Sequence, residues 1–392
     1  MRGRASGVRI VLLAVLSLFV WGTTCAAAPA DAIIRGQAER LPTDEVETYW
    51  NNLMKQYGGY FPEGRAPSFK DLILPGGDEF HFATFARAFV RYVFHEVLYN
   101  GKLLATIVIL TVFSVILETL QTAFERHAVS KVAYAISYMV LLLIAANSFS
   151  VAIGYAKTAI SNMVHFMMAM IPLLLTLLVS MGNVATVSII HPLIVFMIHT
   201  VGTLIYAVVF PLLFISAVLH IVSHLSDKYK VTQLANLLRN VSVALLGVIV
   251  TVFLGVISVQ GGAGAVADGV TIRTAKYITG NFVPVVGRLF ADASDTVIGA
   301  SLIIKNAVGI AGVIMIVIMC AFPAVKILTL AIIYQLSAAV LQPLGHNPIT
   351  GCLQTIGKNL VYVFASLAAV GLMFFLAITI IIAAANVSVM IR

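Results

Sequence analysis

Long apolar segments, separated by short polar, Pro- or Gly-containing breaks, make up most of the chain after residue 102. A helix crosses a hydrocarbon core about 30 Å thick with about 20 apolar residues, because each residue rises about 1.5 Å. Segments near this length are residues 103–123, 132–153, 163–182, 187–206, 207–225, 241–260, 306–322, 325–342 and 360–385. The pattern predicts an all-α, polytopic helical membrane protein with seven to nine spans.

The breaks between the middle segments are hard to place. Between Lys157 and Asp227 there is no Asp, Glu, Lys or Arg, so charge does not mark the ends of helices there. The remaining signals are helix-breaking residues, because Pro lacks a backbone donor and Gly is favoured where helices end. These signals are Pro172, Gly182–Asn183, Pro192 and Pro211.

The first thirty residues have the pattern of a secretory signal peptide. Three arginines precede an apolar stretch, residues 10–21, that is too short to span a bilayer, and small residues follow. Cleavage after Ala30 fits the small-x-small rule with Ala28, whereas a cut after Ala28 would leave Pro29 at a disfavoured position. The alternative is an uncleaved N-terminal anchor.

The composition excludes a soluble globular domain. Hydrophobic residues make up 60% of the chain and charged residues only 10%, whereas soluble domains contain about 45–50% and about 25%. Residues 31–102 carry eight Lys and Arg against ten Asp and Glu, while residues 103–392 carry thirteen against six. A small polar domain therefore precedes a basic membrane body.

Residues 31–102 have amphipathic helical patterns of their own. Thr43 or Asp44 can cap a helix whose apolar face is Val46, Tyr49, Trp50, Leu53 and Tyr57. A second apolar stripe consists of Phe82, Phe85, Phe89, Val93 and Val97. This second helix either lies at the membrane surface or packs in a small helical domain, and the two readings are compatible. We expect an extracytoplasmic amphipathic helical domain.

The two orientation signals disagree. The predicted leader places residues 31–102 outside the cytoplasm, and nine spans then put most basic loops inside, as the positive-inside rule requires. The same count leaves residues 261–305 outside with four cations: Arg273, Lys276, Arg288 and Lys305. The topology of the second half therefore stays open. The expected parts are a membrane domain over residues 103–260, a polar loop or re-entrant segment over 261–305, and further membrane helices over 306–392.

The chain lacks the motifs of common enzymes and nucleotide-binding proteins. It contains no Walker loop, dinucleotide-binding glycine fingerprint, HExxH, CxxC or GxSxG sequence. His220 and His224 are spaced to share a metal, but only Asp227 is near them, and histidines at the membrane interface are the simpler interpretation. We expect no catalytic site, cofactor, metal or nucleic-acid partner.

Glu118 is the only acid inside a predicted span. Charges inside a membrane are costly and are commonly functional. Glu118 also lies within two turns of the far end of segment 103–123, so its side chain can reach the interface. A role in a pore or relay and simple snorkelling are both consistent with this position.

The segment from Thr271 to Ala300 contains unusually many charges for this chain. Arg273, Lys276, Tyr277 and Arg288 are its candidate functional residues, and Gly280 and Pro284 are expected to break it into helical pieces. Irregular backbone at membrane depth survives only where protein or water satisfies its hydrogen bonds. The segment is therefore a docking loop, a re-entrant element facing anions, or a solvated loop with neither role.

Several long strings resemble one family. They are FHEVLYNGKLLATIVILTVFSVILETLQTAF, SKVAYAISYMVLLLIAANSF, YKVTQLANLLRN with FLGVISVQG, TIRTAKYITGNFVPVVGRLF, AFPAVKILTLAIIYQLSAAVLQPLG and YWNNLMKQYGGYFPEG. The chain resembles, from its leader to its C-terminus, the stage III sporulation protein AE family of endospore-forming bacteria. Whole-chain likeness over such strings is more specific than a short motif.

The resemblance implies a role in endospore formation. Proteins of this kind lie in the mother-cell membrane around the forespore and join a transenvelope complex with the forespore protein Q. Other proteins of the stage III A operon, including ring-forming members and the ATPase-like AA member, are the further implied partners. The resemblance leaves open a channel or export-platform subunit, a non-conducting scaffold, and a homo-oligomer in contact with membrane lipid.

Overall fold

Within residues 30–61, 68–73, 82–123, 128–225, 230–282, 286–344 and 348–391, which the computed structural model describes, the chain is helical and contains no strand. The predicted all-α fold class is confirmed. The predicted leader, including Ala28, lies outside these residues, and Ala30 is the first residue of the first described helix.

The elements fall into a group of short helices and a group of long ones. The short elements are α2 (Ala30–Glu39), α3 (Asp44–Tyr57), η2 (Gly58–Tyr60), α4 (Phe69–Ile73), α5 (Phe82–Tyr99) and η5 (Gln342–Leu344). The remaining elements are α6 (Gly101–Ala123), α7 (Ala128–Ser180), α8 (Val184–Leu204), the π-helix η4 (Ile205–Val209), α9 (Phe210–Leu225), α10 (Thr232–Phe282), α11 (Val286–Leu341) and α12 (Pro348–Ile391).

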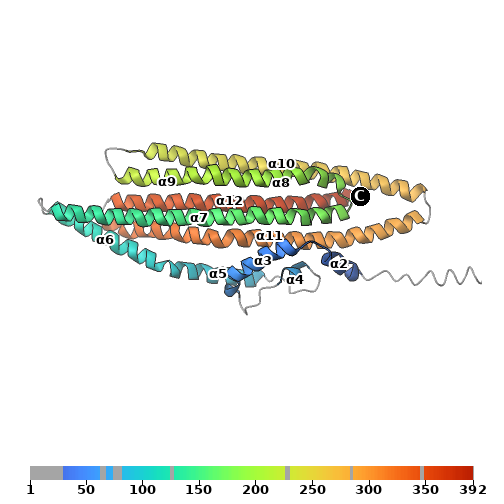
Figure 1. Cartoon of the computed structure of the whole chain (residues 1–392), viewed down its shortest axis with the longest axis horizontal. Helices are drawn as coiled ribbons and strands as arrows, with labels where there is room; N and C mark the ends of the chain where they lie inside the picture. Colours follow the sequence, from blue (N-terminus) through green and yellow to red (C-terminus); the bar gives the residue numbers. More distant parts are fainter. Residues whose placement is uncertain are drawn as a thin grey trace, which may run out of the picture.

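The long helices lie side by side along the long axis of the molecule (Figure 1). α8, η4 and α9 follow one another as a single rod, which pairs with α10, while α7 and α12 lie between this pair and α11 (Figure 1). Ser180 of α7 contacts Ser301 of α11, whereas Ser148 of α7 contacts Tyr334 of α11. These two contacts show that α7 and α11 are antiparallel.

Several predicted segments are joined into longer helices. Segments 132–153 and 163–182 are both part of α7, and segments 306–322 and 325–342 are both part of α11. Pro172, Pro192 and Pro323 lie inside helices, and Pro211 lies within the continuous helical stretch Val184–Ser223. The breaks predicted at Pro172, Pro192 and Pro211 are therefore wrong. Each proline removes one backbone hydrogen bond, and the packing of long neighbouring helices maintains the helix through it.

The break predicted at Gly182–Asn183 is confirmed. Gly182 has a φ of +82°, a left-handed conformation that glycine adopts without steric cost. The backbone N–H of Asn183 donates to the carbonyl of Leu178 at 3.0 Å, which satisfies a carbonyl of the last turn of α7. The chain then reverses directly into α8.

Six helices of the described residues are long and apolar enough to cross a membrane: Ala83–Leu117, Ala135–Ser180, Val184–Ser223, Thr232–Ala275, Asp295–Leu341 and Pro348–Ile391. Ala135–Ser180 contains 46 residues, which corresponds to about 69 Å. A hydrocarbon core is about 30 Å thick. Such a helix is therefore about twice as long as one crossing requires, and the number of crossings stays a prediction.

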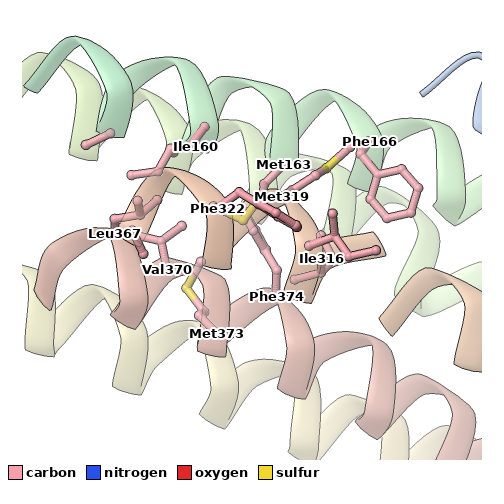
Figure 2. Packing of buried hydrophobic residues seen from close by; sticks show 14 of the residues in the cluster. Ile160, Met163, Phe166, Ile316, Met319, Phe322, Leu367, Val370, Met373 and Phe374 are labelled. Carbon is pink, nitrogen blue, oxygen red and sulfur yellow. The ribbon is translucent and has the colours of Figure 1, made fainter. Parts of the chain in front are cut away.

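The centre of the bundle is filled by apolar side chains from three helices (Figure 2). Met163 and Phe166 of α7, Met319 and Phe322 of α11, and Met373 and Phe374 of α12 are all buried. Met fills irregular gaps because its unbranched side chain is flexible. The interior at this level is a packed core.

The N-terminal helices pack along one side of this bundle. The ring of Tyr57 on α3 stacks on Phe322 with centroids 4.1 Å apart, and Tyr92 on α5 donates its hydroxyl hydrogen to the carbonyl of Phe322 at 3.3 Å. Burial, with a smaller contribution from Glu96, raises the pKa of Tyr57 to about 12, so this ring is uncharged at neutral pH. The apolar face expected on α3 is therefore used for packing, whereas α5 buries Ala88, Tyr92 and Glu96 and leaves Val97 of its predicted apolar stripe 46% exposed.

Replacing Gly357 by Ala is expected to destabilise the bundle, because α12 meets α11 there without room for a side chain. An added Cβ would lie 2.7 Å from Cγ of Gln335 and 3.2 Å from the carbonyl oxygen of Ala331. Overpacking of this kind costs about 1–3 kcal/mol. Gly247→Ala is the matched control, because no atom lies within 4 Å of its added Cβ and Ala is favoured over Gly in a helix by up to about 1 kcal/mol.

Thermal unfolding of the two purified variants in the same detergent measures this difference. The midpoint should fall for Gly357→Ala and stay level or rise for Gly247→Ala. Equal midpoints for the two variants would contradict the close α11–α12 contact.

Candidate functional site

The predicted functional segment forms the ends of two helices. Arg273 and Tyr277 lie on the last turns of α10, where both side chains are exposed, Tyr277 by 71%. Lys276 lies in α10 and Arg288 at the start of α11, and their side chains are outside the described part of the chain. Figure 1 shows these helix ends extending past the C-terminus of α12.

The expected break at Gly280 is wrong, because α10 continues as helix to Phe282. Pro284 lies outside the described residues, between the end of α10 and the start of α11 at Val286. The described part of the segment is therefore two helical arms instead of an irregular loop. Whether these arms dock a partner or line an aqueous path stays a prediction.

Glu118 lies on α6, five residues before the helix ends at Ala123. This confirms that it is close to the end of a helix, as the sequence predicts. Its side chain is outside the described part of the chain, so its role in a pore or relay also stays a prediction.

Asp268 is a buried acid within residues 261–305, for which the sequence predicts a polar loop or re-entrant segment. Its side chain is only 2% exposed. Its two carboxylate oxygens accept hydrogen bonds from the backbone N–H groups of Ala185 and Thr186, each at 2.9 Å. These N–H groups belong to the first turn of α8, where backbone donors have no partner within the helix and the helix dipole favours a negative charge. Asp268 therefore caps α8 from α10.

Lys305 is a buried cation near the same end of the bundle. Its side chain is 1% exposed, and its Nζ donates to the carbonyl of Ile382 at 3.1 Å and to the side-chain oxygen of Asn386. Both partners are on α12. The sequence predicts that Lys305 is one of four cations in the polar segment over residues 261–305. In the structure, Lys305 lies inside α11.

Further hydrogen bonds join the remaining helices at this end. Ser388 of α12 donates to the side-chain oxygen of Asn183 at 2.7 Å, and Ser180 of α7 donates to Ser301 of α11 at 3.2 Å. Ser301 in turn donates to Gln37 of α2 at 3.1 Å. We call Asn183, Asp268, Ser301, Lys305, Asn386 and Ser388 the terminal polar layer. It links five long helices and one N-terminal helix.

A second polar level crosses the bundle about halfway along α7. The Nζ of Lys157 lies 4.4 Å from the ring centroid of Tyr206, and the Nζ of Lys326 lies 4.9 Å from that of Tyr155. We call these four residues the mid-length layer. From Lys157 to Ser180, α7 rises about 35 Å, which is close to the thickness of one hydrocarbon core. The two layers are therefore separated by about the thickness of one hydrocarbon core.

One histidine of the predicted pair, His220, has a described side chain. His220 is buried and lies 3.2 Å from the side-chain oxygen of Asn236 and 3.4 Å from the amide nitrogen of Asn359. The side chain of His224 is outside the described residues. His220 therefore contributes to a polar contact among α9, α10 and α12.

The sequence relationships decide the family. A model of the family described as stage III sporulation protein AE matches residues 67–385. The stage III sporulation protein AE of Bacillus subtilis (strain 168) is 52% identical over 366 residues, which cover 93% of this chain and 92% of that protein. The chain belongs to the stage III sporulation protein AE family. No solved structure matches.

Membership in the stage III sporulation protein AE family supports a role in sporulation, and it fits the helical membrane bundle described above. The family is a membrane component of sporulation and belongs to no known enzyme class.

Asp268→Ala is expected to destabilise the protein by about 1–3 kcal/mol, because two N–H groups at the start of α8 lose their charged acceptor. Thr271→Ala is the control on the same helix, since Thr271 is exposed and its hydroxyl bonds only to the carbonyl of Ala267 in its own helix. Thermal unfolding in detergent is the measurement. A midpoint for Asp268→Ala within error of that of Thr271→Ala would show that the cap contributes nothing.

Proposed function

We propose that this chain is an integral membrane component of a complex that connects the mother cell to the forespore, and that it forms a channel or export-platform subunit there. The observation that carries the proposal is family membership over almost the whole chain, combined with a bundle of long apolar helices. The proposed location is the mother-cell membrane around the forespore, with the mature N-terminus on the extracytoplasmic side.

The packed core argues that any conduit lies between copies of the chain. Met163, Met319 and Phe374 fill the centre of the described bundle, and all are less than 5% exposed. A water-filled path needs polar groups or an open lumen. A single copy offers neither at this level, so a channel requires an oligomer.

The outward face of α10 supports contact between copies. Only 28% of the most apolar stretch of its span is buried, against 61% for the span of α11. The exposed face combines valines with small residues: Val241, Val248, Val252, Gly255, Val259, Gly262 and Val266. In membranes, helices associate through such surfaces because small residues let the backbones approach closely. We therefore place the contact between copies on α10.

The alternative is a non-conducting scaffold that recruits the ring-forming and ATPase-like members of the stage III A operon, together with the forespore protein Q. The observation that favours it is a pair of helical arms, the end of α10 and the start of α11, which extend past the end of α12 (Figure 1). Arg273, Lys276 and Tyr277 belong to α10, and Arg288 belongs to α11. The exposed Arg273 beside the exposed Tyr277 suits a docking surface for an acidic partner.

Gly255→Leu tests the channel, because a large side chain would separate two copies that meet on α10. The expected result is loss of the oligomer in detergent and loss of dye release from liposomes containing the purified protein. Gly154→Leu is the control, since Gly154 is exposed on α7 with no atom within 4 Å of an added Cβ. A known pore that releases dye from the same liposomes is the positive control. If the wild type is oligomeric but releases no dye there, the channel is contradicted and the scaffold is favoured.

Single cysteines at Arg273, Tyr277 and Arg288 test the docking arms. Cys320 and Cys352 are first replaced by Ala, since both are free thiols. Because the arms project beyond the bundle, an impermeant thiol reagent should label all three positions from the same side of the membrane. Labelling of Arg273→Cys from one side and Arg288→Cys from the other would contradict a docking surface and indicate a re-entrant element.

A further inference from the structure

A cavity of about 260 Å³ opens between α7 and the rod of α8, η4 and α9. It lies at the mid-length layer and extends from there toward the terminal polar layer. Lys157 and His165 of α7, His199 of α8 and Tyr206 of η4 are among the residues that line it.

An irregular turn of helix forms one wall. η4 is a π-helix, in which the N–H of Phe210 bonds to the carbonyl of Ile205. The wider turn adds a residue to the helix, and π-turns of this kind occur frequently at functional sites. Tyr206 and Ala207 from this turn line the cavity, and the ring of Tyr206 lies under the ammonium group of Lys157.

The cavity contains one lysine and two histidines, and the helices that line it contain no acid to balance the lysine. Lys157, His165 and His199 line it, and α7, α8, η4, α9 and the neighbouring α12 contain no Asp or Glu in their sequences. Nδ1 of His165 donates to the carbonyl of Ser161 at 2.8 Å, so this ring is held in place by its own helix. A cation over an aromatic ring is stabilised only modestly. An anionic ligand would supply the missing counter-charge.

The remaining wall is apolar. Ile160, Val164 and Phe210 line the cavity beside Lys157 and the two histidines, while Ser161 and Thr203 add two hydroxyl groups. A free, fully hydrated anion gains nothing from such a wall, whereas an amphiphile places its charged group on Lys157 and its chain on the apolar side chains. The composition of the cavity therefore matches a charged head joined to a hydrocarbon chain.

The level of the cavity agrees with this ligand. Lys157 and Tyr206 lie in the same layer as Lys326 and Tyr155. Lys and Tyr gather at the surface of a bilayer, where their charged or hydroxyl ends meet the headgroups and their apolar parts meet the chains. On both sides of this layer α7 continues for about one bilayer thickness without Asp, Glu, Lys or Arg, over residues 132–156 and 158–180.

We propose that this cavity binds the phosphate group of an anionic phospholipid, with Lys157 as the main contact and with His165 and His199 beside it. The acyl chains lie against Ile160, Val164 and Phe210. The same phosphate chemistry could come from free inorganic phosphate, so the experiment includes both sources.

Native mass spectrometry of the purified full chain in detergent measures the binding. Phosphatidylglycerol and phosphatidylcholine with identical acyl chains are added in separate titrations, and wild type is expected to bind phosphatidylglycerol more tightly. Lys157→Gln should weaken phosphatidylglycerol binding about fivefold, the effect of one basic residue at an anionic lipid surface. It should leave phosphatidylcholine binding unchanged, and Lys157→Arg should retain the preference.

Two further variants separate the cavity from general charge and from folding. Lys358→Gln removes an exposed cation from α12 and should bind phosphatidylglycerol as wild type does. Thr203→Phe keeps every charge but fills the cavity, and should reduce binding of phosphatidylglycerol more than Lys358→Gln does. Circular dichroism and thermal unfolding establish that each variant compared is folded.

Two results would overturn the proposal. One is equal affinity of folded Lys157→Gln and wild type for phosphatidylglycerol. The other is displacement of phosphatidylglycerol by an equimolar amount of inorganic phosphate, which would assign the site to a free anion instead of a lipid.

Discussion

The close packing of α11 against α7 and α12 holds the described structure together. α11 contacts α2, α3, α4, α5, α6 and α10 as well as these two neighbours. Phe322, near the middle of α11, receives the N-terminal helices through the stacked ring of Tyr57 and the hydroxyl of Tyr92. At Gly357 and Gly371 the backbone of α12 approaches α11 too closely for a side chain. Association of apolar helices in lipid depends on such packing, because burial from water contributes little there.

Polar side chains then set the register of the helices at two levels. In the terminal polar layer, Asp268 accepts hydrogen bonds from backbone N–H groups at the start of α8, and the buried Lys305 donates to α12. In the mid-length layer, two lysines lie over tyrosine rings. Most of the terminal polar layer is buried, and buried polar groups are stable only when they find partners. A helix that slid by one turn would lose these partners, so the layers specify one arrangement of otherwise similar apolar surfaces.

The sequence predicts the class of this fold well and its connections less well. Apolar segments near 20 residues correctly indicate membrane helices, and Gly182–Asn183 correctly indicates a reversal. Pro172, Pro192 and Gly280 gave wrong breaks, because a long helix with neighbours on several sides retains its packing where one hydrogen bond or one side chain is missing. Asp268 and Lys305 were missed as buried groups, since their partners lie on distant helices that no local pattern reveals.

The central claim is that the long helices lie in lipid and meet water at the mid-length layer. Spin labels placed one at a time at exposed positions along α7, from Val132 through Tyr155 to Val179, test it in reconstituted vesicles. Their accessibility to oxygen, which partitions into lipid, is compared with accessibility to a water-soluble nickel complex. We expect oxygen to reach the spin labels over about 20 residues, and we expect accessibility to the nickel complex to rise at Tyr155. High nickel accessibility along the whole helix would contradict it.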